Sequence, residues 1–366
     1  MKFRCERDAL VETLGTAGRA VSSRGGALPV LSGVRVELRG DRLELTGSDL
    51  DLTITVRAKV TGEEDGVAVV PARLATDIVR ALEPGRVDIV VDEDEARITA
   101  GRSQFAIRVL PAEEFPKLAE PPSHAVTIDA GEFAAALKQV VSAASADDAR
   151  PILTGVLLAA EEGGLRLVAT DSYRLALRDL PGASVLAEGQ TVLVPSRALS
   201  ELARLLDPKA SLVLHLGERE ASFDIGDGAV RLVTRLIEGE FPPYRGLIPS
   251  SYPNQLTVGR DPLLDALRRV KLMAREATPV RLHLVPDGLE LTAVTQDVGQ
   301  AHEELDAKYE GTELTVAFNP DYLLDGVEVT PGDEVIIQTL DALKPAVIRS
   351  SEGSDFLYLL MPVRVS

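Results

Sequence analysis

Two features that the sequence lacks limit where this protein can reside. No apolar run approaches the ~18–20 residues that cross a bilayer, and the opening segment MKFRCERDAL has no apolar stretch of the signal-peptide type. We therefore expect a cytoplasmic protein. The single cysteine, Cys5, excludes a disulfide within the chain. It alternates with Met1 and Phe3 as on an opening strand, which predicts a small buried core residue.

The motifs of common catalytic and metal sites are also missing. The four histidines are scattered, and His302-Glu303-Glu304 lacks the second histidine of a zinc-binding helix. No phosphate-binding loop, nucleophile elbow or calcium-loop spacing is present. We expect no catalytic residue, no metal and no cofactor. An enzyme that binds a metal through its acidic clusters is the weaker alternative, because those carboxylates would have to converge from different repeats.

Positive charge is in the minority, with 39 Lys and Arg against 57 Asp and Glu and a net charge of −18. Such a total argues against nucleic acid, whose binding depends on a basic surface. The net charge does not show, however, where the charged residues lie. Acidic clusters such as Asp92-Glu93-Asp94-Glu95 fall at turns and strand ends.

What the sequence does contain is a threefold repeat. The segments from Pro29 to Asp49 and from Pro151 to Asp171 have equal length, and the segment from Pro279 to Asp297 is two residues shorter. Each has two alternating apolar and polar runs joined by a glycine-containing turn, the pattern of a β-hairpin. The aspartates that end the three segments are predicted to share one position with a turn or capping role.

Each repeat is predicted to run helix, hairpin, strand, helix and further strands, with antiparallel pairing because the connections are too short for parallel crossovers. This is an α+β chain of three similar domains, residues 1–122, 123–250 and 251–366, separated by proline-rich segments. The apolar stripes that predict five of the six helices are Leu10, Leu14, Ala17 and Val21; Leu74, Ile78 and Leu82; Phe133, Leu137, Val140 and Ala144; Leu199, Leu202 and Leu206; and Leu263, Leu267 and Val270.

Five of the six predicted helices carry Lys or Arg away from the apolar stripe. The sixth, around residues 322–324, has none, and the pattern does not explain this exception. Any single basic side chain here is more simply interpreted as solvent-facing. The sorting of charge by position nevertheless favours a polyanion that meets this one repeated surface. The basic residues concerned are Arg19, Arg73, Arg80, Lys138, Arg197, Arg204, Arg268 and Arg269.

Several segments carry a resemblance to a known family over essentially the whole chain. They are the opening MKF, the Pro-x-Leu-x-Gly-Val start of the hairpin, ATDSYRLA at 169–176, EFPPYR at 240–245 and LMPVR at 360–364. In their order and spacing the chain resembles the bacterial sliding clamp, the β subunit of DNA polymerase III. The resemblance implies a head-to-tail homodimer, a ring of six domains with antiparallel sheets outside and helices lining a central channel for duplex DNA. It also implies a processivity factor without chemistry of its own, and adds Arg24 to the DNA-facing residues.

In that family a groove between the second and third domains binds a short peptide motif of the replicative polymerase, the clamp loader and repair proteins. One departure from the family is Gly246, which stands where many relatives have a basic residue. Core packing is the alternative interpretation for Leu153, Leu175 and Leu359. The lining that the resemblance implies here is Leu153, Thr170, Ser172, Tyr173, Arg174, Leu175, Pro242, Leu247, Leu359, Met361, Pro362, Val363 and Arg364.

Helix counting supports a dimer. Six helices spaced ~9 Å apart around a ring would leave a bore of only ~6 Å, whereas twelve would leave ~23 Å, enough for a duplex. The resemblance places ring closure at Phe105 of one chain and at Leu272 and Met273 of the other. Two alternatives to the replicative clamp remain open: a specialised second clamp, and a partner-binding scaffold with altered peptide specificity that never holds DNA.

Overall fold

The structure, a computed structural model, describes residues 1–22, 28–117, 125–161, 163–274, 278–286, 288–353 and 355–364. The chain splits into two compact units. The first consists of Met1–Gly131 and Glu201–Leu236, and the second of Glu132–Ser200 and Ile237–Ser366. Each unit therefore contains one outer repeat and part of the middle repeat. The boundary predicted at residue 122 lies outside the described residues.

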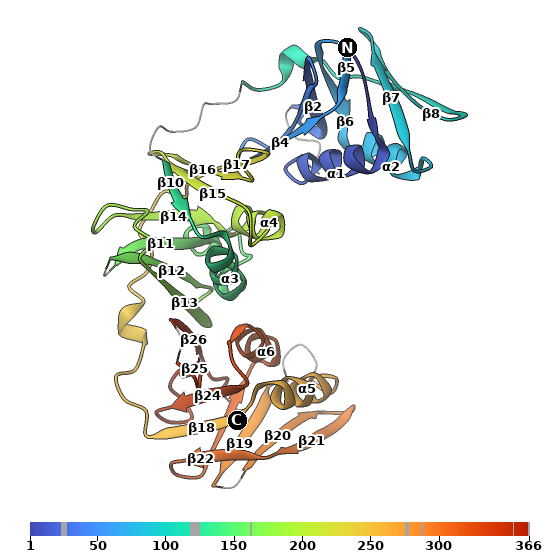
Figure 1. The fold of residues 1–366 in the computed structure, drawn as a ribbon. Coiled ribbons are helices and arrows are strands. Elements are labelled where there is room, and N and C mark those ends of the chain that lie inside the picture. Colours follow the sequence, from blue (N-terminus) through green and yellow to red (C-terminus); the bar gives the residue numbers. More distant parts are fainter. Residues whose placement is uncertain are drawn as a thin grey trace. The chain divides into compact units, whose positions relative to one another are not determined.

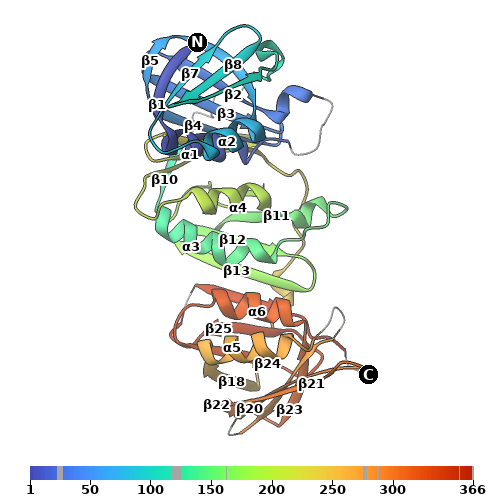
Figure 2. The same cartoon turned by 90° about the vertical axis from the view of Figure 1, so that its right-hand side faces the viewer.

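The first unit contains two antiparallel sheets and the helices α1 (Arg7–Gly18) and α2 (Ala72–Ala81), which lie beside each other and together pack on strands of both sheets (Figures 1 and 2). The five-stranded sheet has the order β5 (Thr61–Glu64), β1 (Lys2–Glu6), β7 (Arg86–Val91), β8 (Glu95–Ala100), β9 (Ser103–Arg108). The eight-stranded sheet has the order β10 (Ala125–Ile128), β15 (Leu212–Leu216), β16 (Glu220–Ile225), β17 (Val230–Arg235), β4 (Leu52–Lys59), β3 (Arg42–Ser48), β2 (Gly33–Arg39), β6 (Gly66–Pro71).

The second unit also contains two antiparallel sheets. The nine-stranded sheet has the order β14 (Thr191–Pro195), β11 (Gly155–Glu161), β12 (Gly164–Thr170), β13 (Arg174–Pro181), β26 (Phe356–Leu360), β25 (Ala346–Ser350), β24 (Glu334–Thr339), β18 (Asn254–Gly259), β22 (Ala307–Glu310). The four-stranded sheet has the order β21 (Gly299–Leu305), β20 (Gly288–Thr295), β19 (Val280–Val285), β23 (Leu314–Phe318). Helices α5 (Arg260–Lys271) and α6 (Pro320–Val329) lie beside each other (Figure 2), while α3 (Ala130–Val140) and α4 (Ser196–Leu205) contain residues of both units.

The three predicted hairpins are confirmed. They are the antiparallel pairs β2–β3, β11–β12 and β19–β20. In the first two copies the opening proline starts a short 3-10 turn, Pro29–Ser32 and Pro151–Thr154, before the strand begins. Its fixed φ suits the first residue of such a turn, and its missing N–H is not needed there.

The predicted apolar stripe of α2 is wrong for Leu74, which is 50% exposed, whereas Leu82 just beyond the helix is buried and Ile78 is half-buried. The buried residues within the helix are Ala72, Ala75 and Val79. Both sets of positions follow a helical period, but α2 turns its small side chains toward the sheet, because these allow a closer approach of the helix. The other four stripes are buried within their helices, and Val21 and Ala144 lie just beyond the helix ends and are half-buried. Among the described residues, no helix combines the length and apolar character needed to cross a membrane.

Cys5 lies on β1, as predicted, but is half-buried rather than part of the core. Burial, with smaller contributions from Glu6 and Asp88, raises the pKa of its thiol to about 11. The thiol therefore stays protonated and is a poor nucleophile near neutral pH.

Gly326 is expected not to tolerate a side chain. It lies in α6 against the ring of Tyr358 on β26, and a Cβ there would be 2.4 Å from Cδ1 of that ring. Because Tyr358 is fully buried, the ring has no room to move, and we expect Gly326→Ala to cost about 1–3 kcal/mol and to lower the urea midpoint of unfolding. Gly15→Ala is the control, since a Cβ at this position of α1 meets nothing within 4 Å. Equal midpoints for the two variants would contradict the packing of α6 on β26.

Candidate functional site

A tight turn between β12 and β13 organises the predicted groove. Asp171 is buried, and its Oδ1 accepts hydrogen bonds from the backbone N–H groups of Tyr173 (2.9 Å) and Arg174 (3.0 Å). Ser172 has a φ of 81°, a region that non-glycine residues rarely occupy. The turn therefore depends on Asp171, as the predicted turn role requires, and it presents the Tyr173 side chain at the surface.

The same turn recurs in the first repeat but not in the third. Asp49 Oδ1 accepts hydrogen bonds from the N–H groups of Asp51 (3.1 Å) and Leu52 (2.8 Å), and Leu50 has a φ of 80°. In the third repeat Asp297 itself has a positive φ, 62°. The prediction of one shared position is therefore wrong for Asp297, which takes the place of the left-handed residue because aspartate tolerates that conformation.

Arg174 is the centre of a network that joins β13 to α6. Its Nε donates to Asp171 Oδ2 at 3.0 Å, its Nη1 donates to Asp325, and its guanidinium carbon lies 4.3 Å from the ring centre of Tyr322. The hydroxyl of Tyr358 lies 3.4 Å from Nη1 and donates to the Tyr322 carbonyl at 2.8 Å. The Arg174 side chain is only 10% exposed, so its positive charge interacts mainly with carboxylates of the protein itself.

The protonation states of this network are fixed near neutral pH. Burial alone would lower the pKa of the Arg174 guanidinium, but Tyr358 and Asp325 raise it above its usual range. Burial raises the pKa of the Tyr358 hydroxyl well above its usual range. Both side chains therefore remain hydrogen-bond donors throughout the physiological range.

The C-terminal segment is hydrogen-bonded beside this turn. The N–H of Met361 donates to the Tyr173 carbonyl at 2.9 Å, and the N–H of Val363 donates to the Ala317 carbonyl at 2.8 Å. The Tyr173 ring also stacks on that of Tyr322, with centroids 6.4 Å apart. Tyr173, Met361 and Val363 are all exposed. They form an exposed apolar rim beside the turn.

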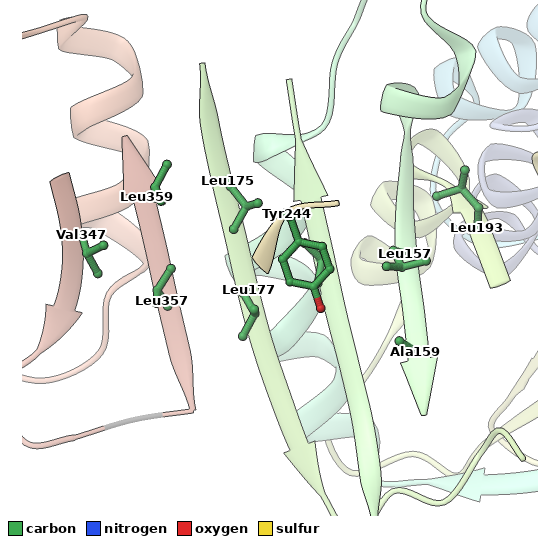
Figure 3. Packing of buried hydrophobic residues seen from close by; sticks show 10 residues of the cluster. Leu157, Ala159, Leu175, Leu177, Leu193, Tyr244, Val347, Leu357 and Leu359 are labelled. Carbon is green, nitrogen blue, oxygen red and sulfur yellow. The ribbon is translucent and has the colours of Figure 1, made fainter. Parts of the chain in front are cut away.

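An apolar cluster lies on the neighbouring face of the nine-stranded sheet. Leu175 and Leu177 of β13 pair with Leu359 and Leu357 of β26 (Figure 3). Because Leu175 and Leu359 are buried, core packing accounts for much of their surface, whereas Leu153 is only half-buried. The cluster consists of Leu157, Ala159, Val168, Leu175, Leu177, Leu193, Tyr244, Val347, Leu357 and Leu359.

The segment 237–252, which we call the connector, packs on this cluster. Tyr244 is buried in the cluster, and Ile237, Phe241, Ile248 and Tyr252 are partly buried against it. The Tyr244 ring meets that of Phe241 edge-on, with centroids 6.2 Å apart. The connector is therefore held by the same apolar surface that forms the predicted floor of the groove.

An ion-pair chain fastens the connector to the sheet. Arg245 pairs with Glu161 at the end of β11, and Glu161 also lies 2.5 Å from Arg166 on β12. These contacts leave the predicted groove residues Pro242 and Leu247 exposed on the connector surface. Gly246 between them is exposed as well and contributes no side chain.

The corresponding sheet surface of the first unit is polar. Leu175 and Leu177 correspond to Thr53 and Thr55 of β4, 122 residues earlier in the chain. Thr55 lies 3.2 Å from the hydroxyl of Thr46. An apolar peptide side chain gains little from such a surface, so among the described residues this part of the first unit does not repeat the apolar cluster of the second.

The structure brings most of the predicted groove residues together. Thr170, Arg174 and Leu175 lie at the turn beside β26 and Met361, and Pro242 and Leu247 lie on the connector. Leu153 is linked through Arg150, whose carbonyl accepts the Leu153 N–H and whose side chain donates to the Asp171 carbonyl. Ser172 and Arg364 are exposed and Pro362 is half-buried. Sequence reasoning missed Tyr244, Tyr322, Asp325, Val347 and Leu357, of which only Tyr244 lies within a recognisable segment, EFPPYR.

The predicted DNA-facing residues are exposed wherever the structure describes them. Arg24 lies outside the described residues. Arg73 and Arg80 border a cleft of about 480 Å³ between α1 and α2 and share Asp77, at 3.9 and 3.6 Å. Arg19 and Arg204 likewise share one carboxylate, Glu201. The exposed set is Arg19, Arg73, Arg80, Lys138, Arg197, Arg204, Arg268 and Arg269.

The residues predicted for ring closure lie at the surface. Phe105 is an exposed side chain on β9, an edge strand of the five-stranded sheet. Leu272 directly follows α5 and is 82% exposed, and the neighbouring Met273 is half-buried. In the part of the chain that the structure describes, no three His, Cys, Asp or Glu side chains gather as a metal site would require.

Three family models match this chain in succession. The N-terminal domain of the DNA polymerase III beta subunit matches residues 1–119, the central domain 127–243, and the C-terminal domain 245–364. The three repeats of this chain therefore match the N-terminal, central and C-terminal domains of one family, in that order.

Relatives and solved structures match over the full length. A beta sliding clamp from Streptomyces coelicolor is 35% identical, covering 100% of both chains. The crystal structure of a DNA polymerase sliding clamp from Bacillus subtilis has a TM-score of 0.91 at 32% identity, again over 100% of both chains. The same values hold for a sliding clamp from Pseudomonas aeruginosa that was crystallised bound to griselimycin.

Proposed function

The chain belongs to the DNA polymerase III beta subunit family, and we propose from this premise how its surfaces serve replication. It has three clamp domains and is a DNA sliding clamp, a processivity factor that performs no chemistry. The observation that carries this function is the end-to-end match to proteins named beta sliding clamp. That match favours a sliding clamp over a specialised second clamp or a scaffold that never holds DNA. We keep 1–122, 123–250 and 251–366 as the proposed domain limits, and the cytoplasm as the proposed location.

The first specific proposal is a head-to-tail homodimer that closes into a ring around duplex DNA. Two edge strands support it, β9 in the first unit and β21 in the second. Phe105 is exposed on β9, and Leu272 is exposed at the end of α5, which packs on β21. Exposed apolar side chains next to open sheet edges form surfaces that another chain can cover.

Ring closure is tested by Leu272→Asp. The unaltered 39.1 kDa chain should sediment at about twice its mass, and, once loaded, should stay on a closed DNA circle but slide off after linearisation. The variant should be monomeric and should not be retained, because a buried unpaired charge opposes association. Leu343→Asp is the control, because Leu343 is also highly exposed but lies in the β24–β25 turn. A monomeric unaltered chain, with no ring in electron micrographs, would refute the proposal.

The second proposal concerns the helices. Their exposed arginines and lysine face the duplex and attract its phosphates without reading sequence. The support is that every described member of the set is exposed although the chain is acidic overall. Attraction is weak and salt-sensitive, and the closed ring provides retention.

The third proposal concerns partners. The replicative polymerase, the clamp loader and repair proteins bind by a short apolar peptide motif between the connector and the C-terminal segment. Support comes from the exposed rim of Tyr173, Met361 and Val363 beside the apolar cluster, with Leu247 on the connector. Such a combination of apolar side chains with a few fixed polar groups is typical of ligand sites. The griselimycin-bound relative supports the view that a clamp of this family can bind a ligand other than DNA.

A further inference from the structure

Helix α6 differs from the other helices in its charge, and the structure supplies a reason. It carries the carboxylates Asp321, Asp325 and Glu328 and has no Lys or Arg. Asp321 forms an ion pair with Lys271 of α5, and Glu328 lies 3.4 Å from Arg268 of α5. Asp325 serves the groove network instead. Two of the three carboxylates on α6 thus face the basic end of α5.

The remaining cation at this end of α5 is paired as well. Arg269 donates two hydrogen bonds to Glu303 of β21, at 2.7 and 2.9 Å. This bidentate geometry is the strong form of the arginine–carboxylate interaction. Arg268 has a second partner, Asp265, at 3.4 Å. All three basic side chains in the last turn of α5 are therefore paired with a carboxylate. For Arg269, both Nε and Nη2 donate hydrogen bonds to Glu303.

The helix pair of the first domain is different. Arg73 and Arg80 share a single carboxylate, Asp77, at 3.9 and 3.6 Å, and neither guanidinium donates a hydrogen bond to any residue that the structure describes there. The Arg73 side chain is 96% exposed. Both arginines border the open cleft between α1 and α2. The N–H groups of these two arginines are available to a phosphate. The basic side chains of α5 would first have to break their ion pairs with carboxylates.

We propose that α6 neutralises the basic face of α5, so that α5 attracts the DNA phosphates less than Arg73 and Arg80 of the first domain's helix pair do. This inference rests on the proposed function, in which the helices face the duplex. A cation paired with a carboxylate adds no net charge to the surface and releases no counterion on binding DNA. The cations of α5 then add little to the total attraction, which stays low enough for sliding.

The test is a gain of DNA affinity. In the full-length dimer, Asp321→Asn with Glu328→Gln should free Lys271 and Arg268 for phosphate contacts. We expect duplex affinity at low salt to rise by about three- to tenfold, and the slope of log affinity against log salt to steepen by up to ~2 per chain. Circular dichroism checks that the variant keeps its helix content, because Asp321 lies in the first turn of α6. Glu310→Gln with Glu313→Gln is the matched control, because both residues are exposed in the same domain and away from the helices.

A companion variant separates this inference from the function on which it rests. Arg73→Ala with Arg80→Ala should lower duplex affinity, and this result together with the gain from the α6 variant supports the inference. If the arginine variant loses affinity while the α6 variant matches the unaltered protein, neutralisation by α6 is overturned and the DNA-facing assignment stands. An equal gain in the Glu310 and Glu313 control also overturns it, because net charge alone would then explain the effect. If the arginine variant keeps full affinity, both the assignment and the inference are overturned.

Discussion

A chain that ends at Leu360 should form the ring and hold DNA yet fail to bind a polymerase-derived peptide. The truncation removes Met361 and Val363 from the rim, together with their hydrogen bonds to the Tyr173 and Ala317 carbonyls. Strand β26 ends at Leu360, so the sheet keeps its pairing. Loss of one hot-spot side chain costs a peptide complex about 2 kcal/mol or more. We therefore expect peptide affinity to fall by about 30-fold or more, and processive synthesis to be lost.

Fluorescence anisotropy with a labelled peptide measures this effect, and retention on circular DNA shows that the ring is intact. A chain that ends at Arg364 is the matched control, because it keeps the whole rim, and it should bind the peptide like the unaltered protein. Met361→Ala should fall between the two. If the chain ending at Leu360 binds the peptide as tightly as the full chain, the peptide site lies elsewhere.

Replacing Arg73, Arg80, Arg197 and Arg204 together with alanine should weaken DNA binding strongly and leave the dimer intact. All four are exposed on α2 and α4. Each phosphate contact contributes ~0.9 to the slope of log affinity against log salt, so the loss of several contacts should lower low-salt affinity by about tenfold or more and flatten the slope. Binding should weaken equally for different duplex sequences, because phosphate contacts carry no sequence information.

A salt titration of duplex binding, alongside sedimentation of the free protein, checks this result. The control removes four exposed arginines from strands, Arg39, Arg42, Arg86 and Arg235, which changes the net charge by the same amount. The control should bind DNA more tightly than the helix variant does. The assignment of the helix face fails if the helix variant has the affinity and salt slope of the unaltered protein.

The sequence was sufficient to predict local elements with a strong period. The alternation in β2, β3 and their repeats depends on which residues are apolar, and this can be read directly from the chain. The face of α2 could not be predicted in the same way. Leu74 continues a plausible stripe with Ile78 and Leu82, but whether it or the small Ala72 and Ala75 faces the sheet depends on the space that the sheet leaves.

The sequence predicts the strands and the turn that line the groove, but not the distant residues that hold those side chains in place. Arg174 was assigned to the lining, yet its side chain is held by Asp171 nearby and by Asp325, 151 residues away. No periodicity indicates a partner at that separation. The same holds for α6, whose lack of basic residues is explained only by the contacts of its carboxylates with Lys271 and Arg268 of α5. Long-range ion pairs depend on which elements the fold places side by side.

The position of β26 has a consequence for biosynthesis. This last strand of the chain pairs with β13 on one side and β25 on the other, so it lies inside the nine-stranded sheet. Domains fold in order as the chain emerges from the ribosome, but this sheet stays divided until the final residues have been released. The groove beside Leu359 and Met361 is then the last surface to form. With the peptide site proposed above, a nascent chain that has not yet released β26 has no groove in which to bind a polymerase peptide.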